Sequence, residues 1–343
     1  MIHSVIRKLI AISCASLLAA CGSGTPSTGT GGGYFDYSTH PDAWAGGVRM
    51  VPIRTADGNF NVWVKRVGNN PDLKLLILHG GPAMGHDYLD AMDTILPGAG
   101  VEYYQYDQLG SGLSDRPDND DLWTVDRFVD EVEQVRNALG LTKDNFCLYG
   151  QSWGGILAIE YALKHQAELK CLVISNMMAS FPAYNEYADR VLKPELKPED
   201  LKLVEQLEAG GKTDDPRYMG ILIPEFYEKH ILRRPFSEWP FGVLHSLNTV
   251  NEHVYTLMQG PSELGGGGRL ANWDRFDDLK QINVPTLVIG AKYDTMDPAY
   301  MEKMAKQLPQ GEYAYMPEGS HLAMYDDQQN YDKALAGFLK KFD

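Results

Sequence analysis

The chain has 343 residues, a length that suits one large domain carrying an insertion. Its composition, 44% apolar and 22% charged, is that of an ordinary globular protein and argues against global disorder. The net charge of -15 argues against a nucleic-acid partner, because binding phosphate requires a basic surface and no basic cluster stands out.

Residues 1–21 form a segment typical of export. Two basic residues precede the apolar run LIAISCASLLAAC, which is short for a membrane span and suits a secretory signal. The end of this run, at Cys21, resembles the bacterial lipoprotein lipobox, in which cleavage leaves a lipidated N-terminal cysteine; a signal peptide that merely ends near a cysteine is the alternative. Residues 22–40 are typical of a flexible tether. We therefore expect an exported lipoprotein, anchored to a membrane of the bacterial cell envelope through Cys21.

From residue 48 onward, short apolar runs alternate with helical patterns. The turn signal Asp57-Gly58 between the first two runs predicts an antiparallel hairpin. Residues 125–139 place apolar side chains at helical spacing, which predicts a helix packed against a sheet. This alternation predicts an α/β fold with a mainly parallel sheet and helices on both faces. The expected strands are VRMVPI, FNVWVKRV, LKLLILH, VEYYQYD, FCLYG, LKCLVIS, PTLVIG and EYAYMP.

The alternation stops between residues 178 and 275, where helical patterns are separated by loops containing proline and glycine. We interpret residues 178–275 as a helical cap inserted into a core formed by residues 41–177 and 276–343. Cys147 and Cys171 both lie in apolar strand-like runs of this core. Export permits a disulfide, but we expect buried free thiols in adjacent strands.

The stretch YGQSWGG, which contains Ser152, follows one of the expected strands and precedes a helical run. It is a G-x-S-x-G motif in the strand-turn-helix setting of a nucleophile elbow, where Gly150 and Gly154 avoid collisions with the neighbouring strand and helix. A structural turn is the alternative, because serine and glycine commonly share loops. The setting predicts a nucleophilic Ser152 and an α/β-hydrolase fold.

A serine nucleophile requires a base and an orienting carboxylate, which follow it in this fold in the order acid, then histidine. His321 lies in a Gly-Ser loop after the last expected strand and is the predicted base. Asp294 follows PTLVIGAKY at the carboxyl end of a strand, where ligand sites of parallel sheets lie, and is the predicted acid. Asp297 precedes Pro298 and is expected to cap the next helix, although spacing alone also permits the two aspartates to exchange roles.

The glycine-rich stretch LHGGPAMGHDY follows another expected strand. Its glycines allow the backbone to turn amides toward the nucleophile, so the N–H groups of Gly81 and Trp153 are the predicted oxyanion hole. Each such donor is worth roughly 3 kcal/mol. His79 is expected only to stabilise this loop through a hydrogen bond.

Several stretches carry a family resemblance, namely HGGPAMGHDYL, YDQLGSGLSDRP, LWTVDRFVDEVEQVRNALGL, GQSWGG, NEHVYTLMQGPSEL, NWDRFDDLKQINVPTL and GSHLAMYDD. In this order they resemble the prolyl iminopeptidase and tricorn-associated aminopeptidase family of α/β-hydrolases, across both core and cap. The resemblance implies a catalytic triad of Ser152, Asp294 and His321, with Gly81 and Trp153 as oxyanion donors. It also implies removal of one N-terminal residue, often proline, from short peptides or amino-acid amides, without a metal or another cofactor.

The resemblance also bears on how a free N-terminus is bound. Members with known specificity use two glutamates, which is physically reasonable because a desolvated ammonium group needs carboxylates beside it. One of them corresponds to Glu263, whereas the other, directly after the triad aspartate, is replaced here by Thr295. We expect Glu263 to bind the ammonium group, with Asp297 or another cap carboxylate partly substituting at the place that Thr295 leaves uncharged. The alternative is that Glu263 only stabilises the cap.

The leading hypothesis is an exported serine aminopeptidase, tethered to a membrane, that acts on short peptides or amino-acid amides through an acyl-enzyme. Thr295 favours the nearest rival, a carboxylesterase or amidase acting on uncharged acyl groups. A third hypothesis, a non-catalytic binding lipoprotein, leaves the complete set of triad and oxyanion positions without a physical reason.

Overall fold

The computed structural model describes residues 46–343. The expected signal segment, the lipidation site at Cys21 and the tether of residues 22–40 lie outside the described residues. These predictions therefore stay predictions.

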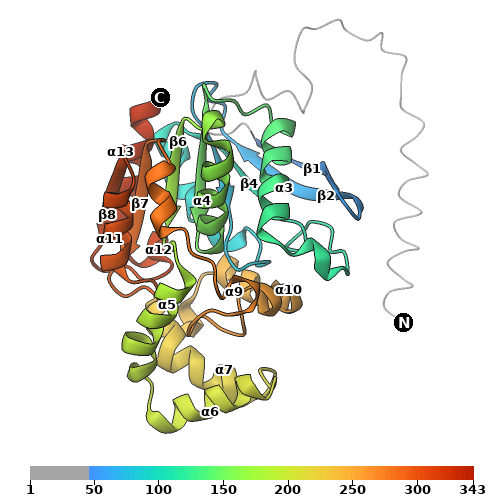
Figure 1. Cartoon of the computed structure of the whole chain (residues 1–343). Helices are drawn as coiled ribbons and strands as arrows, with labels where there is room; N and C mark the ends of the chain where they lie inside the picture. Colours follow the sequence, from blue (N-terminus) through green and yellow to red (C-terminus); the bar gives the residue numbers. More distant parts are fainter. Residues whose placement is uncertain (1–45) are drawn as a thin grey trace, which may run out of the picture. The chain divides into compact units, whose positions relative to one another are not determined.

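An eight-stranded sheet lies at the centre of residues 46–343, in the order β1-β2-β4-β3-β5-β6-β7-β8 (Figure 1). The first two strands form the predicted antiparallel hairpin, and β2 pairs antiparallel with β4. All remaining pairs are parallel, which confirms the predicted mainly parallel sheet. The strands are β1 Gly46–Thr55, β2 Gly58–Val67, β3 Lys74–Leu78, β4 Glu102–Tyr106, β5 Phe146–Gln151, β6 Cys171–Ser175, β7 Thr286–Ala291 and β8 Gly311–Met316.

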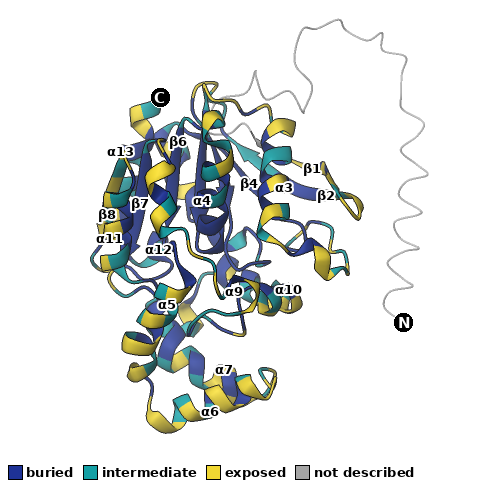
Figure 2. Cartoon of the chain, in the orientation of Figure 1, coloured by how far each residue is buried: buried dark blue, intermediate teal, exposed yellow. Residues whose placement is uncertain are grey.

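Helices cover this sheet, and their buried faces follow the apolar spacing of the sequence (Figure 2). The predicted helix at 125–139 is α3, Val125–Ala138, whose N-cap Thr124 accepts a hydrogen bond from the Arg127 amide. It lies beside α4, Trp153–His165 (Figure 1). No helix within residues 46–343 combines the length and the apolar character needed to cross a membrane. The other core helices are α2 Met92–Ile95, α11 Pro298–Gln307, α12 Ala323–Asp326 and α13 Gln328–Leu339.

Between β6 and β7 the chain forms a helical segment, in which α6 and α7 lie farthest from the sheet (Figure 1). Its two ends are held together by an antiparallel bridge between Ser180 and Asp274 and by a 2.9 Å hydrogen bond between their side chains. We interpret this segment, residues 178–275, as the helical cap. Its α-helices are α5 Phe181–Tyr187, α6 Pro198–Ala209, α7 Pro216–Leu222, α8 Glu228–His230, α9 Phe241–Thr249 and α10 Glu252–Met258.

Cys147 and Cys171 are joined by a disulfide, so the expectation of two free thiols is wrong. The two residues are direct partners in the parallel register of β5 and β6, with their Cα atoms 4.6 Å apart. This separation lies within the range that a disulfide spans. The sequence places both cysteines in strands, but it does not reveal that these strands are neighbours or that the two positions are in register.

Candidate active site

Ser152 lies at the turn between β5 and α4, with φ 54° and ψ -126°. A positive φ is strained for a residue with a side chain and persists only where surrounding contacts enforce it. Here the Ser152 amide donates to the Ser175 carbonyl at 3.0 Å, and its carbonyl accepts from the Gly155 amide at 2.7 Å. The turn therefore has the geometry of a nucleophile elbow.

The glycines that flank Ser152 leave no room for side chains. A Cβ atom on Gly150 would lie 2.0 Å from the Gly154 carbonyl oxygen, and a Cβ atom on Gly154 would lie 2.1 Å from the Leu78 carbonyl oxygen. Both contacts are with backbone, which cannot swing away as a flexible side chain would. The elbow thus depends on glycine at these two positions.

Replacing Gly154 by alanine is expected to lower the free energy of unfolding by about 3 kcal/mol, because the added methyl group overlaps the β3 backbone. A matched control is Gly337→Ala in α13, where an added Cβ meets nothing within 4 Å. That change is expected to raise the free energy by roughly 0.5–1 kcal/mol through helix propensity. Urea unfolding of both variants checks this, and equal stability of the two would contradict the proposed crowding.

His321 and Asp294 form a buried pair, with His321 Nδ1 2.7 Å from Asp294 Oδ1. The carboxylate is fixed by further donors, Asn176 Nδ2 at 2.7 Å on Oδ2 and the Met296 amide at 3.2 Å on Oδ1. Because Nδ1 faces Asp294, Nε2 is the ring nitrogen that remains for proton exchange with another group. The structure thus brings together the predicted acid and base.

The surroundings of His321 favour its protonated form. Burial lowers the pKa of the imidazole, but the charge of Asp294, its hydrogen bond to the ring and the charge of Glu263 together raise the pKa above its ordinary value. An imidazolium formed by taking up a proton is therefore stabilised in place.

A cavity of about 540 Å³ brings Ser152 and His321 together with residues of the cap. Three carboxylates line it, those of Asp214, Glu252 and Glu263, and no lysine or arginine among residues 46–343 does so. The fixed charge of the lining is therefore negative. Much of the remaining wall is apolar and comes from the cap, including Tyr218, Met219, Ile223, Phe236, Val243 and Leu247.

Glu263 is held by three tyrosines from separate parts of the cap. Tyr255 donates to Glu263 Oε1 at 2.5 Å, and Tyr184 donates to the Glu263 carbonyl oxygen at 2.6 Å. The Tyr227 hydroxyl is hydrogen-bonded to the Glu263 backbone. Burial, with a smaller contribution from the charge of Asp294, raises the pKa of the Glu263 carboxyl above its ordinary value, although the charge of His321 and the Tyr255 hydrogen bond act in the opposite direction. The Glu263 carboxylate lines the cavity, and a cation bound beside it would stabilise its charged form.

The other two predicted substrate residues lie elsewhere. Asp297 is the N-cap of α11, as expected, and its Oδ1 accepts from the Ala299 amide at 2.9 Å. Its Oδ2 lies 3.8 Å from Arg190 Nη2. Thr295 is fully buried, with its hydroxyl 3.2 Å from His321 Nδ1. Among the described residues, the cavity lining includes neither Asp297 nor Thr295.

Of the two predicted oxyanion residues, Gly81 shares the cavity lining with Ser152, and Trp153 follows Ser152 directly in the chain. Gly81 lines the cavity beside Ser152 and has a positive φ of 111°, a conformation that favours glycine. Trp153 is the first residue of α4, so its N–H has no acceptor within the helix. Two backbone donors near Ser152 are the arrangement that an oxyanion hole requires.

Two residues that the sequence analysis did not single out connect these parts. The Tyr88 hydroxyl accepts from the Gly80 amide at 2.6 Å and donates to Gln151 Oε1 at 2.6 Å. Gln151 Nε2 in turn donates to the His321 carbonyl oxygen at 3.0 Å. The glycine loop, the elbow and the histidine loop thus share one buried network. The only sequence signal for this network is the position of Gln151 directly before Ser152.

His79 stabilises the glycine loop as expected. Its Nδ1 lies 2.8 Å from the Gly80 carbonyl oxygen, and its Nε2 accepts from the Gln108 amide at 3.0 Å. Burial lowers the pKa of this imidazole. A neutral ring of this kind can serve as donor and acceptor at once.

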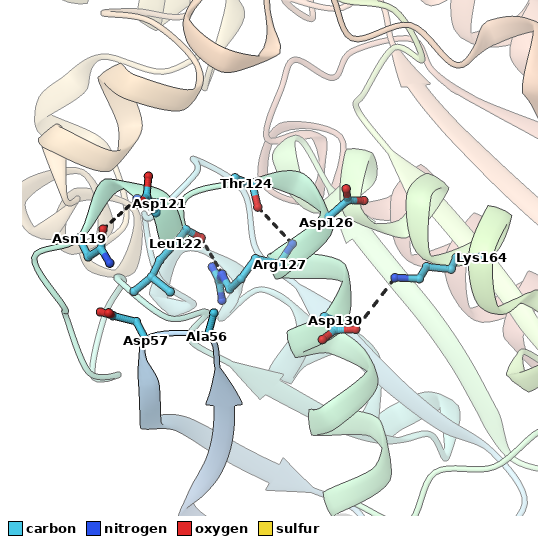
Figure 3. Close-up of a pocket in the computed structure, with 10 residues that line it drawn as sticks. All are labelled: Ala56, Asp57, Asn119, Asp121, Leu122, Thr124, Asp126, Arg127, Asp130 and Lys164. Atoms are coloured by element: carbon cyan, nitrogen blue, oxygen red, sulfur yellow. Dashed lines mark hydrogen bonds and ion pairs between the residues drawn. The ribbon is translucent and has the colours of Figure 1, made fainter.

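A second cavity, of about 660 Å³, lies between the β1–β2 turn and the start of α3 (Figure 3). It holds Asp57, Asp126 and an ion pair between Lys164 and Asp130 at 4.0 Å, but none of the triad residues. Within residues 46–343, no group of histidine, cysteine or carboxylate side chains is arranged to hold a metal ion. Of the candidate catalytic groups, Gly81, Ser152 and His321 line the first cavity, and Asp294 is buried against His321.

Several known proteins are similar to this chain. Residues 75–201 match the family model of the alpha/beta hydrolase fold. The chain is 54% identical to the proline iminopeptidase of Flavobacterium johnsoniae, over 84% of this chain and 97% of that protein. It is 53% identical to the proline iminopeptidase of Elizabethkingia meningoseptica, over 86% of this chain and 98% of that protein.

Solved structures give the same result. The crystal structure of VinJ matches with a TM-score of 0.79 at 30% identity, over 86% of this chain and 99% of VinJ. The crystal structure of proline iminopeptidase from Mycobacterium smegmatis matches with a TM-score of 0.75 at 30% identity, over 86% of this chain and 98% of that chain. The chain therefore belongs to the proline iminopeptidase family of α/β-hydrolase enzymes.

Proposed function

We propose that this enzyme is a serine aminopeptidase that releases one N-terminal residue, with proline among those accepted, from short peptides or amino-acid amides. The Ser152 hydroxyl attacks the carbonyl carbon of the first residue while His321 takes up the hydroxyl proton. Asp294 holds the ring orientation and stabilises the imidazolium. The N–H groups of Gly81 and Trp153 donate to the oxyanion that develops on the carbonyl oxygen.

Collapse of this intermediate breaks the amide bond. His321 returns the proton to the leaving amine, and the released N-terminal residue remains as an ester on Ser152. Water then attacks this ester with His321 again acting as base, which releases the free amino acid and restores the serine hydroxyl.

The position of Glu263 favours an aminopeptidase over an enzyme for uncharged acyl groups. A substrate ammonium group loses water on entering the cavity, a loss that is costly unless a carboxylate meets it there. Glu263 lines the same cavity as Ser152 and His321, and the hydrogen bond from Tyr255 fixes its carboxylate. An enzyme for uncharged acyl groups has no physical need for this arrangement. The relatives described above, named proline iminopeptidases, support the same substrate class.

A substrate panel tests the proposal. We expect free amino-acid arylamides, proline included, to be turned over with a much higher kcat/KM than their N-acetylated forms. Simple p-nitrophenyl esters, tested beside them, measure the intrinsic reactivity of the serine toward uncharged acyl groups. Equal kcat/KM for the free and the acetylated arylamides would instead support the esterase or amidase alternative.

We also propose that the enzyme is exported and anchored through Cys21. The signal-like segment and the lipobox-like ending support this, and so does the Cys147–Cys171 disulfide, because disulfides persist mainly in oxidising compartments. Labelled palmitate is expected to be incorporated by the full chain and not by a Cys21→Ala variant. Incorporation that is unchanged in this variant would contradict the anchor.

A further inference from the structure

Thr295 has a hydroxyl group buried beside the catalytic pair. Its Oγ1 lies 3.2 Å from His321 Nδ1 and 3.3 Å from Asp294 Oδ1, and the residue has no exposed surface. A fully buried hydroxyl normally makes hydrogen bonds, because leaving it unpaired costs about 1–3 kcal/mol. The partners of this hydroxyl are therefore the two groups on which proton transfer depends.

The protonation pattern of the pair fixes the direction of these hydrogen bonds. The His321 Nδ1–H group donates to Asp294 Oδ1, since an ionised carboxylate only accepts. The Thr295 hydroxyl can then donate its hydrogen to the same Oδ1 and direct a lone pair toward Nδ1–H. This closes a small ring of contacts in which the hydroxyl touches both members of the pair.

We propose that Thr295 is a positioning residue for the general base, holding the His321 ring and the Asp294 carboxylate in one mutual orientation and moderating the pull of that carboxylate on the ring proton. The proposal rests on the proposed role of His321 as the base. We expect Thr295 itself to touch no substrate, because it lies outside the cavity lining.

The moderating effect follows from charge. A hydrogen bond donated to a carboxylate stabilises and disperses its negative charge, so the carboxylate attracts a neighbouring imidazolium less strongly. Two titratable groups act on the charge of the His321 ring, Asp294 from the loop after β7 and Glu263 from the cap, and both raise the pKa of His321. Removing the Thr295 hydroxyl strengthens the contribution of Asp294 and raises the pKa of His321 further.

Two substitutions separate the hydroxyl from the shape of the side chain. Thr295→Val keeps the branched shape and loses the hydroxyl, whereas Thr295→Ser keeps the hydroxyl and loses a methyl group. We expect the valine variant to lose about tenfold in kcat, corresponding to one hydrogen bond, with little change in KM. The acidic limb of its kcat/KM profile is expected to move to higher pH, because a base with a raised pKa is lost earlier as the pH falls. The serine variant is expected to keep the wild-type pH profile.

Rates are normalised to the fraction of each preparation that reacts with a fluorophosphonate, so partly folded material does not enter the comparison. An unshifted acidic limb in Thr295→Val, or an equal shift in Thr295→Ser, would overturn the proposal. An uncharged acyl ester serves as substrate equally well, since the test follows the base and not the amine. Failure of amine recognition is thus distinguishable from failure of the Thr295 proposal.

Discussion

Replacing Ser152 by alanine is expected to lower kcat by at least about 10⁴-fold, because no other group forms the acyl-enzyme. The strained turn and its backbone contacts involve no atom of the serine hydroxyl. Alanine has a Cβ atom as serine does, so the substitution relieves little of the backbone strain at φ 54°. The free energy of unfolding is therefore expected to stay close to that of the wild-type enzyme.

A fluorophosphonate probe checks this assignment chemically. Mass spectrometry of the labelled enzyme is expected to find the probe on Ser152 and to find no labelling in Ser152→Ala. Ser237→Ala, at an exposed position of the cap, is the matched control and is expected to label and turn over normally. Turnover or labelling that survives in Ser152→Ala would show that the elbow serine is not the nucleophile.

The second large effect is expected for Glu263→Gln. Glutamine keeps the shape of the side chain and an oxygen that can accept from Tyr255, but it removes the negative charge. Loss of a charged partner for a buried ammonium group costs roughly 2–3 kcal/mol, so kcat/KM for a free prolyl arylamide is expected to fall about 30–150-fold. An uncharged acyl ester loses no such partner and is expected to react at nearly the wild-type rate.

Glu252→Gln is the matched control for this prediction. Glu252 lines the same cavity but is exposed to solvent, so its charge is screened and contributes little. The control is expected to change kcat/KM for the prolyl arylamide by less than about threefold. Equal losses on the charged and the uncharged substrate in Glu263→Gln would mean that Glu263 only stabilises the cap.

Much of the core could be predicted because its signals are local. Each expected apolar run became a strand. The signal is strongest for the central parallel strands, which are buried on both faces and are therefore continuous apolar segments such as Thr286–Ala291. The elbow could be located because strand, motif and helix are contiguous around Ser152. The pairing of His321 with Asp294 followed from a chain order that this fold imposes.

The remaining features depend on tertiary contacts that no local pattern encodes. The disulfide requires the register of β5 against β6, and the three tyrosines around Glu263 come from segments up to about 80 residues away in the chain. The side chain of Thr295 could point toward substrate or toward the pair, and only the backbone path after Asp294 decides this. Closeness in sequence to a catalytic residue therefore does not show whether a side chain lines the cavity.

Two substrates of nearly equal shape show whether the cavity selects a free N-terminal amine for attack by Ser152. Prolyl p-nitroanilide and cyclopentanecarbonyl p-nitroanilide share the ring size and the leaving group but differ in the charged ring nitrogen. We expect a kcat/KM at least about 30-fold higher for the prolyl compound, from an interaction of about 2 kcal/mol. Equal values of kcat/KM for the two compounds would contradict selection of the free amine.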